Sequence, residues 1–370
     1  MLVLRYWRKH RVHALSTDRH LGLKCPTSMS RMDEISIGNS DSEGAWLDRR
    51  GATTNIARGT HRSPIRLGTA NVRKGNPVAD ANTEKFQHFV AKMQLKRFID
   101  AKKWLHVWNR HVGKVMPQRH NKTFGETHLY STENEAGEKD TWFEKRLNAL
   151  ETAAEPLLKK IEDAARLGMA PTFNEAEKAM LDRFFYTQWK RVPDFLGQAA
   201  SLKGSEALDE IFAELRARHP DQLDRLAELD TPESRKRLMQ GGKVQGLAVD
   251  SARILSLFAR RGLVILQLPD EGDGFIIGSM PVVRTGQSLE DEDGEAWLPI
   301  TPRLAIGPGM AEGTITLAKF DPAALEEFNR IVANQSTMFG GPDPAQIEKL
   351  GKWVLARKQA KAAEDDDAAS

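Results

Sequence analysis

The feature that most constrains the fold is a change of hydrophobic period at Gly262. From about Thr83 to Arg261, apolar residues recur mostly at helical spacing with charged residues between them. After Gly262 the apolar residues gather in short β-branched runs, which Gly, Pro and acidic turns separate. We therefore expect an α+β fold in which a helix-rich N-terminal half packs on a small antiparallel sheet. No linker-like segment separates the halves, so the sequence predicts a single domain over residues 83–355.

Helices are predicted most clearly in the first half of this domain. Within Trp142–Arg166, one set of apolar residues falls in an arc of about 100° on a helical wheel: Phe143, Leu147, Leu150, Ala154, Leu157, Leu158 and Ile161. Asn174 followed by Glu177 has the pattern of a capping box, so a second helix is expected from Glu175 to about Lys190. Further helices are expected over residues 204–218, 220–229, 232–261 with an interruption at Gly241–Gly242, 322–334, and from 344 onward.

Strands are predicted in two places. Residues 104–116 alternate side chains on either side of a turn at 109–113, and they should form a hairpin that is buried on both sides. The second place is the region after Gly262, where short apolar runs predict antiparallel strands. An acidic segment there, residues 288–296, predicts a solvated connection. The runs cover residues 263–268, 274–285, 297–307 and 314–320.

Positive charge is concentrated at the N-terminus. Residues 1–80 hold 14 Lys and Arg against 7 Asp and Glu, whereas the whole chain holds 54 against 51. This segment has no sustained apolar period, so we expect residues 1–82 to be a disordered basic arm. One interpretation is that the arm contacts nucleic-acid phosphates. Another is that it is a weakly selected extension, or that translation begins at Met29, Met32 or a later residue. At the other end, residues 356–370 are expected to be a frayed acidic tail.

Composition excludes several classes of protein. A hydrophobic content of 40% suffices for a core, and a net charge of +3 argues against a nucleic-acid coat protein. The single cysteine, Cys25, excludes a disulfide framework and cysteine-rich metal modules. The longest apolar run, residues 263–268, is far shorter than the roughly 20 residues of a membrane span. The first residues also lack the apolar core of a secretion signal, so we expect a soluble cytoplasmic protein that does not associate with membranes.

The motifs of common enzyme classes are absent from the sequence. There is no P-loop, dinucleotide-binding glycine motif, zinc-protease motif or nucleophile elbow. Two histidine pairs, His106 with His111 and His120 with His128, lack helical i, i+4 spacing with a carboxylate, so no metal site is predicted. The motifs therefore name no cofactor, and they leave open whether the protein is an enzyme.

Two polar residues stand on the apolar face of the helix expected over residues 175–190. Gln188 lies in the middle of that face and Arg191 lies beside it. If buried, both need hydrogen-bond or charge partners. The candidates are Glu144 and Glu151 at the edge of the preceding helix, which an antiparallel helix pair would bring close. Such a group is either an internal network that fixes helix packing or a polar pocket for a ligand or acid–base chemistry.

Two further candidates come from other segments. His88 stands among Phe86, Phe89 and Val90, where a lone histidine is either a core residue or a functional one. Ser279 stands near a proline at the end of an expected strand. Turn chemistry accounts for such a serine as well as a binding site does.

A series of short motifs occurs in a fixed order along residues 86–350. It comprises a His-x-Val-x-x-x-x-Leu-x-x-Phe opening at His88, a Leu-Tyr step at Tyr130, a helix bearing Glu144 and Glu151, a Gln-x-x-Arg step from Gln188 to Arg191, the strands Phe275–Pro281 and Pro299–Pro302, and Asn329. In this order the motifs resemble the bacterial domain-of-unknown-function family numbered 4238. The resemblance leaves the basic arm uncovered.

The resemblance implies a fold shared with that family and a site built from the matched residues. The departures are concentrated in the opening, where Ala91 and Lys92 replace Pro-Gln and Gln94 replaces Tyr. Met280 stands where the family tends to have Asp. If that Asp were a catalytic base or held a ligand, this chain would be impaired or would use another group. A structural role for the Asp is equally compatible.

We therefore expect a hydrolase-type enzyme that acts on a small anionic substrate, a phosphate or a carboxylate. Arg191 would clamp the anion, with Glu144 or His88 as the general base. The alternative is a non-catalytic module in which the same residues form a structural polar network and the surface binds a protein or nucleic acid. The full candidate site comprises His88, Glu144 and Glu151 as catalytic residues and Tyr130, Gln188, Arg191 and Ser279 as substrate-binding residues.

Overall fold

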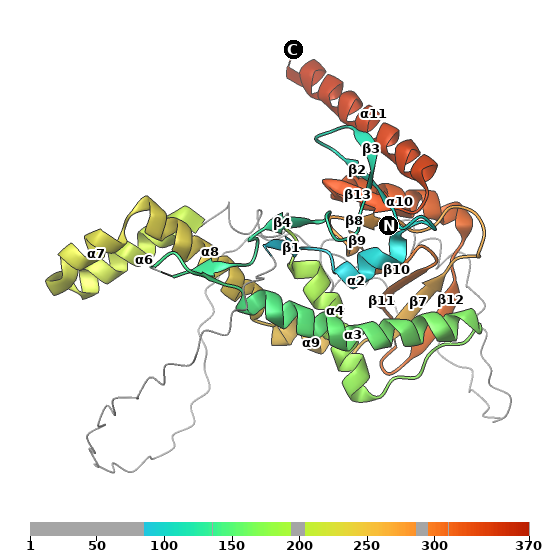
Figure 1. Cartoon of the computed structure of the whole chain (residues 1–370), viewed down its shortest axis with the longest axis horizontal. Helices are drawn as coiled ribbons and strands as arrows, with labels where there is room; N and C mark the ends of the chain where they lie inside the picture. The colour runs from blue at the N-terminus through green and yellow to red at the C-terminus, as the bar shows by residue number, and fades with distance from the viewer. Residues whose placement is uncertain (1–84, 135, 194–203, 286–294, 310, 370) are drawn as a thin grey trace, which may run out of the picture. The chain divides into compact units, whose positions relative to one another are not determined.

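The computed structural model of the chain (Figure 1) describes residues 85–134, 136–193, 204–285, 295–309 and 311–369. These residues belong to one compact unit. The predicted basic arm, residues 1–82, lies outside the described residues. So does most of the predicted acidic connection over residues 288–296, of which residues 288–294 are not described.

The larger sheet forms from the short apolar runs after Gly262. Its strand order is β12-β7-β11-β10-β9. The strands are β7 (Leu263–Gln267), β9 (Val283–Thr285), β10 (Glu295–Thr301), β11 (Leu304–Pro308) and β12 (Ile315–Lys319). The predicted runs at 263–268, 297–307 and 314–320 are therefore strands of one sheet, and the run at 274–285 supplies β9 to it.

The prediction that all these strands are antiparallel was wrong for β12, which pairs with β7 in parallel. β11 and β12 lie on opposite sides of β7, so the chain crosses from one side to the other beside the first residue of β7. The crossing is tight, because a Cβ on Gly262 would lie 2.4 Å from the carbonyl oxygens of Ala311 and Thr314. An apolar β-branched run predicts a strand but carries no information about the direction of its partner.

The second sheet joins segments from both halves of the chain. Its order is β3-β2-β13-β8, with β2 (Leu105–Asn109), β3 (Lys114–Gln118), β8 (Ile277–Gly278) and β13 (Met338–Gly341). The predicted hairpin at residues 104–116 is confirmed as β2 and β3, and β2 buries Val107 and Trp108 on opposite faces. The strand β13 was not predicted, because its sequence Met-Phe-Gly-Gly is short and half glycine.

Short elements complete the β-structure near the start of the described chain. β1 (Phe86–His88) pairs with β4 (Gly125–Thr127), and β5 (Thr132–Glu133) pairs with β6 (Lys139–Asp140). Between β1 and β2 lie α2 (Lys92–Leu95) and the 3-10 helix η1 (Lys96–Phe98). Sequence periodicity predicted none of these elements, because each is too short to show a period.

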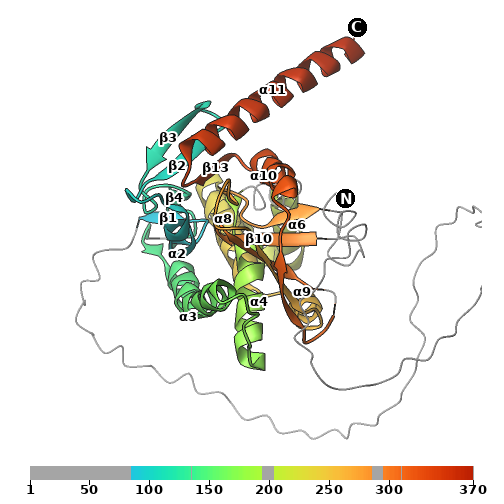
Figure 2. The same cartoon turned by 90° about the vertical axis from the view of Figure 1, so that its right-hand side faces the viewer.

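The two strongest helix predictions are confirmed at both ends. α3 covers Trp142–Arg166 and α4 covers Glu175–Lys190, and the Asn174–Glu177 capping box is formed. The chain reverses between them, so Glu177 near the start of α4 pairs with Lys160 of α3 at 2.9 Å. In Figure 2, α4 lies between α3 and α9 (Ala252–Ala259).

The helices that follow α4 are confirmed except for one boundary. They are α6 (Gly204–Arg218), the 3-10 helix η2 (Pro220–Gln222), α7 (Leu223–Leu229) and α8 (Pro232–Ala248). The predicted interruption at Gly241–Gly242 was wrong, because α8 runs through both glycines and the break falls between Ala248 and Ala252. Each glycine weakens a helix by only about 1 kcal/mol. Ser251 instead starts a new helix by accepting a hydrogen bond from the amide of Ile254.

Two helices close the chain, α10 (Pro322–Gln335) and α11 (Pro344–Ala369). Both begin at the predicted prolines. α11 continues through residues 356–369, where a frayed tail was expected, and the fraying itself stays a prediction. No helix in the described part of the chain combines the length and the apolar character needed to cross a membrane.

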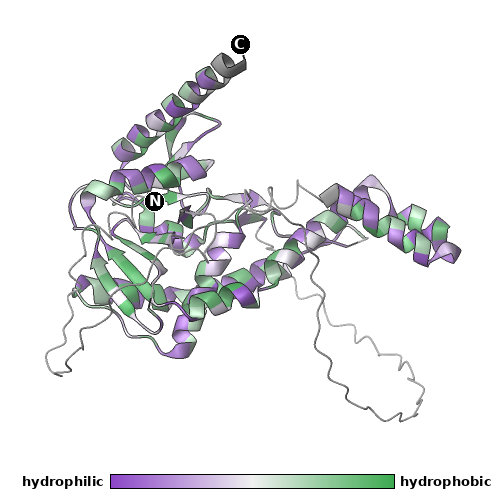
Figure 3. Ribbon diagram, turned by 180° about the vertical axis from the view of Figure 1, so that it is seen from behind, coloured by the Kyte–Doolittle hydropathy of each residue, from purple (hydrophilic) through white to green (hydrophobic). Residues whose placement is uncertain are grey.

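Buried apolar side chains form a layer between the helices and the larger sheet. Leu158 and Ile161 of α3 and Phe184 of α4 share one cluster with Ile265 of β7 and Leu298 of β10. Figure 3 shows that the strands of this sheet are mostly hydrophobic. A second cluster packs α10 and α11 on β13 and β2, and a third packs the segment after β1, α2 and the start of α3 together. The α+β class is thus confirmed.

Candidate functional site

Arg191 is the largest fully buried side chain near the end of α4, with 1% of its surface exposed. Its Nε donates to the carbonyl oxygen of Phe89 at 2.9 Å, and its Nη1 donates to Glu151 Oε1 at 2.6 Å. The predicted pairing of this arginine with a glutamate of the preceding helix is therefore present. We call Glu144, Glu151, Tyr130, Gln188 and Arg191 the interior cluster.

Charge inside this cluster is balanced by pairing. Burial alone lowers the pKa of Arg191, but the Glu151 carboxylate and the other negative groups around it raise that pKa above its ordinary value. The guanidinium therefore stays charged in the interior. Such a pair is stable only while both partners are present, because either charge alone carries a large desolvation cost.

Tyr130 fixes the end of α4 from the other side. Its hydroxyl donates to the carbonyl oxygen of Arg191 at 2.6 Å, and its backbone amide donates to Gln87 Oε1 at 2.6 Å. Burial raises the pKa of Tyr130 well above its usual range, so the hydroxyl keeps its proton. Tyr130 thus holds the backbone of Arg191 in place, and its only donor proton is already in use.

Gln188 is the least satisfied member of the cluster. It is fully buried, and within the described residues neither atom of its amide has a hydrogen-bond partner. The same holds for Nη2 of Arg191. An unsatisfied buried polar group costs roughly 1–3 kcal/mol.

Glu144 and His88 are both buried near this group. The negative charge of Glu144 contributes to the pKa shifts of both Arg191 and Tyr130, which places the carboxylate within electrostatic reach of each. His88 pairs with Gly125 through its backbone in β1, and its ring meets the edge of Phe86 at a centroid distance of 5.1 Å. The next residue, Phe89, accepts the hydrogen bond from Arg191, so His88 adjoins the cluster through the backbone.

Ser279 is separate from these residues. Its Oγ accepts from the backbone amides of Thr337 at 2.9 Å and Met338 at 3.4 Å, and it shares a hydrogen bond with Thr337 Oγ1 at 3.1 Å. These contacts hold the turn before β13 against the end of β8. Met280 contacts the same turn, because its amide donates to Ser336 Oγ at 3.3 Å.

Asn329, another residue of the resemblance, also has a structural place. Its amide donates to the carbonyl oxygen of Gly274 at 2.8 Å and accepts from the backbone amide of Ile276 at 3.2 Å. The side chain therefore acts like a strand partner for the segment that leads into β8. Gln94 plays a similar part, donating to the carbonyl oxygen of Pro299 at 2.6 Å.

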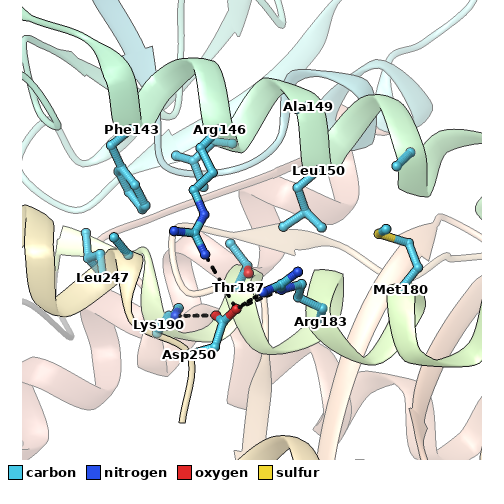
Figure 4. A pocket seen from close by; sticks show the side chains of 13 residues that line it. Phe143, Arg146, Ala149, Leu150, Met180, Arg183, Thr187, Lys190, Leu247 and Asp250 are labelled. Carbon is cyan, nitrogen blue, oxygen red and sulfur yellow. Dashed lines mark hydrogen bonds and ion pairs between the residues drawn. The ribbon is translucent and has the colours of Figure 1, made fainter. Parts of the chain in front are cut away.

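An open pocket lies on another side of the α3–α4 pair (Figure 4). It has a volume of about 250 Å³ and is bounded by α3, α4, the end of α8 and Asp250. None of the residues proposed from the sequence lines it. We call it the Asp250 pocket. Its charged residues are Arg146, Arg183, Lys190 and Asp250.

Three cations converge on the Asp250 carboxylate, as the dashed lines in Figure 4 mark. Lys190 Nζ lies 2.9 Å from Oδ1, Arg183 Nε lies 2.7 Å from Oδ2, and Arg146 Nη2 lies 3.6 Å from Oδ2. Burial alone raises the pKa of Asp250, but the hydrogen bonds and charges of Lys190 and Arg183 bring it below its ordinary value. Burial lowers the pKa of Lys190.

Sequence reasoning missed this pocket. Arg183 and Lys190 are seven residues apart, so they share one face of α4, but a charged stripe on a helix is usually solvated. Asp250 stands in the break between α8 and α9, whereas the sequence predicts the break at Gly241–Gly242. A correct position for that break was the one signal that would have drawn attention to Asp250.

Neither region has the ligands of a metal site. Within the described residues, no group of three or more His, Cys, Asp or Glu side chains converges in a way that would hold a metal ion. The interior cluster offers an anion a guanidinium and an amide, and the Asp250 pocket offers it two guanidiniums and an ammonium. Both arrangements suit oxyanions.

Comparison with known proteins gives a family and no activity. No curated protein and no solved structure matches the chain. A family model described as "Protein of unknown function (DUF4238)" matches residues 87–339, which is more than half of the chain. The match includes the interior cluster, Ser279 and all the charged residues of the Asp250 pocket, and the chain therefore belongs to the DUF4238 family.

Proposed function

We propose that the protein is a hydrolase-type enzyme that holds a small anionic substrate, a phosphate or a carboxylate, at the interior cluster. One observation carries the proposal. The Gln188 amide and Arg191 Nη2 are buried and lack partners within the described residues, although they belong to a cluster whose other donors are used. A substrate oxyanion bound between them would accept hydrogen bonds from both.

Each residue of the cluster has a part in this proposal. Arg191 clamps the anion, and Glu151 keeps the guanidinium charged and oriented through their 2.6 Å contact. Gln188 donates from its amide. Glu144 or His88 acts as the general base that activates water. Tyr130 positions the backbone of Arg191, and Ser279 acts from a distance by fixing the turn before β13.

A second candidate is a non-catalytic module in which the same residues are a scaffold. It is favoured by the burial of Arg191, Gln188, Tyr130 and Glu144 and by the absence of all of them from the lining of the Asp250 pocket. In this case the partner is a protein or, through the basic residues 1–80, a nucleic acid. Deleting residues 1–82 would then abolish salt-dependent binding to DNA and RNA. Unchanged binding would dispose of the nucleic-acid partner.

The two candidate functions predict different effects of the substitution Gln188→Met. If the amide serves a substrate, the thioether removes an unsatisfied buried group, so the melting temperature stays or rises. Stabilisation by phosphate or acetate, present in the unaltered protein, is then lost. If the amide belongs to a scaffold, neither anion stabilises the unaltered protein or the variant. Gln222→Met, at an exposed glutamine, is the matched control.

Activity provides the second measurement. Hydrolysis of p-nitrophenyl phosphate and p-nitrophenyl acetate should be detectable and should fall at least a hundredfold in Glu144→Gln or in His88→Asn, whichever residue is the base. Equal, unaltered rates in both variants would contradict the proposed roles of these two residues. Retention of the folded state is checked by circular dichroism.

A further inference from the structure

The Asp250 pocket contains more positive charge than its own carboxylate can balance. Arg146, Arg183 and Lys190 all approach Asp250, so the lining carries an excess of two positive charges. Cations this close together repel one another, and one carboxylate shared by three cations offsets only part of that repulsion. A bound anion would offset the rest.

The three cations are not equally accessible. Lys190 lies at the inner end of the pocket, with 6% of its side chain exposed, and it also donates to the carbonyl oxygen of Val249 at 3.0 Å. Arg146 and Arg183 are both 47% exposed. The two guanidiniums come from different helices, α3 and α4, and in Figure 4 both reach toward Asp250. An anion arriving from solvent would meet these two first.

Apart from Thr187, the rest of the lining is apolar. Phe143, Leu147 and Leu150 of α3 form one wall, and Met180 of α4 and Leu247 of α8 extend it. Leu150 and Met180 are the partly exposed members of this wall, and inorganic phosphate would leave them in contact with water. The pocket volume of about 250 Å³ is just below the range of roughly 300–1,000 Å³ that is usual for drug-sized ligands. A short apolar chain or a single ring fits such a space.

We propose that the Asp250 pocket binds an organic anion with one oxyanion head and a short apolar body. The head, a carboxylate or a phosphate monoester, is held by the guanidiniums of Arg146 and Arg183 beside Lys190. The body lies along Phe143, Leu147 and Leu150. This site is separate from the interior cluster, whose residues do not line it.

The experiment measures binding to the full-length protein by isothermal titration calorimetry with four probes. Octanoate and octyl phosphate carry both parts of the proposed ligand, acetate carries a charge without the apolar body, and 1-octanol carries the body without the charge. We expect octanoate or octyl phosphate to bind at least tenfold more tightly than acetate and 1-octanol. The octyl compound that binds more tightly identifies the head group.

Variants test the position of the site. The double variant Arg146→Gln/Arg183→Gln should weaken binding of the stronger probe at least tenfold, since both guanidiniums that hold the head group are lost. Arg166→Gln, at an exposed arginine of the same helix, is the matched control and should bind like the unaltered protein. Ala153→Leu, which places a larger side chain in the lining, should weaken octanoate binding without removing any charge.

Three results would overturn the proposal. The first is that neither octyl compound binds at millimolar concentration. The cations would then have only a structural role, holding α3, α4 and the α8–α9 break together. The second is binding that the double variant leaves unchanged, and the third is binding equally strong for 1-octanol. Gln188→Met should keep full octanoate binding, so failure of the interior-cluster function is distinguishable from failure of this site.

Discussion

The interior cluster and the Asp250 pocket use the same pair of helices in opposite ways. In the cluster one guanidinium, that of Arg191, has one carboxylate within hydrogen-bond distance and is hidden from solvent. In the pocket one carboxylate, that of Asp250, has three cations around it, two of them about half exposed. The guanidinium in the cluster therefore depends on a single carboxylate, whereas the carboxylate in the open pocket has several cationic partners.

This difference has energetic consequences. Removing one partner from a buried pair leaves a charge in a medium that solvates it poorly, which costs about 3–5 kcal/mol. Removing one of several partly exposed partners leaves the others in place, and water solvates what remains. Substitutions in the two regions should therefore differ in their effect on stability by several-fold, although the contacts have similar lengths.

The largest effect is expected for Glu151→Gln. The substitution leaves the buried Arg191 guanidinium without its closest negative charge, so the free energy of unfolding should fall by about 3 kcal/mol. Urea denaturation measures this. Glu155→Gln, at an exposed position of the same helix, should change stability by less than about 0.5 kcal/mol. A loss as small as that of the control would show that the pair is not needed for stability.

The next effect is expected for Tyr130→Phe. The phenylalanine keeps the ring and removes the hydroxyl that donates to the carbonyl oxygen of Arg191. Loss of this buried hydrogen bond should lower the free energy of unfolding by about 1–2 kcal/mol. The same substitution at the partly exposed Tyr186 is the control. Equal losses of unfolding free energy at both positions would mean that the hydrogen bond from Tyr130 to the end of α4 adds no particular stability to the cluster.

A smaller effect is expected for Lys190→Met in the pocket. The methionine keeps most of the apolar stem, and Asp250 keeps its contacts with Arg183 and Arg146. Because burial already lowers the pKa of Lys190, its charged form is less stable there than in water. The free energy of unfolding should fall by roughly 1 kcal/mol. A loss as large as that of Glu151→Gln would remove the distinction between the two regions.

The smallest effect is expected in the pH dependence of Asp250. Its pKa in the folded protein lies below its ordinary value of 3.8. A lowered acid pKa contributes stability that is present above the unfolded pKa and is lost as the pH falls through the folded pKa. The stability advantage of the unaltered protein over Asp250→Asn should therefore shrink below about pH 4. A difference that stays constant from pH 5 to pH 3 would contradict this linkage.

The interior cluster could be predicted because its members are placed by local periodicity. Gln188 and Arg191 stand on the apolar face of a helix whose bounds follow from its cap and its apolar stripe. Their partner Glu151 borders the apolar stripe of the preceding helix. Two adjacent amphipathic helices have few ways to bury both stripes, so the pairing follows from the sequence.

Ser279 and Asp250 could not be assigned in this way. Ser279 is predicted as a site residue from its own strand end, whereas the amides that bind its hydroxyl belong to residues 337 and 338, far along the chain. Asp250 looked like a residue inside a long helix, but it stands at a break and faces two other helices. In both cases the contacts that decide the role join segments that no local pattern connects.

The sequence by itself determined the bounds of α3 and α4, the change to β-structure after Gly262 and the burial of the Arg191 group. These depend on side-chain periods and caps within about twenty residues. The tertiary structure alone decided that β12 runs parallel to β7, that β13 joins the hairpin β2–β3, and that three cations meet at Asp250. Such features depend on which distant segments meet, and the free energy of that choice is shared by the whole core.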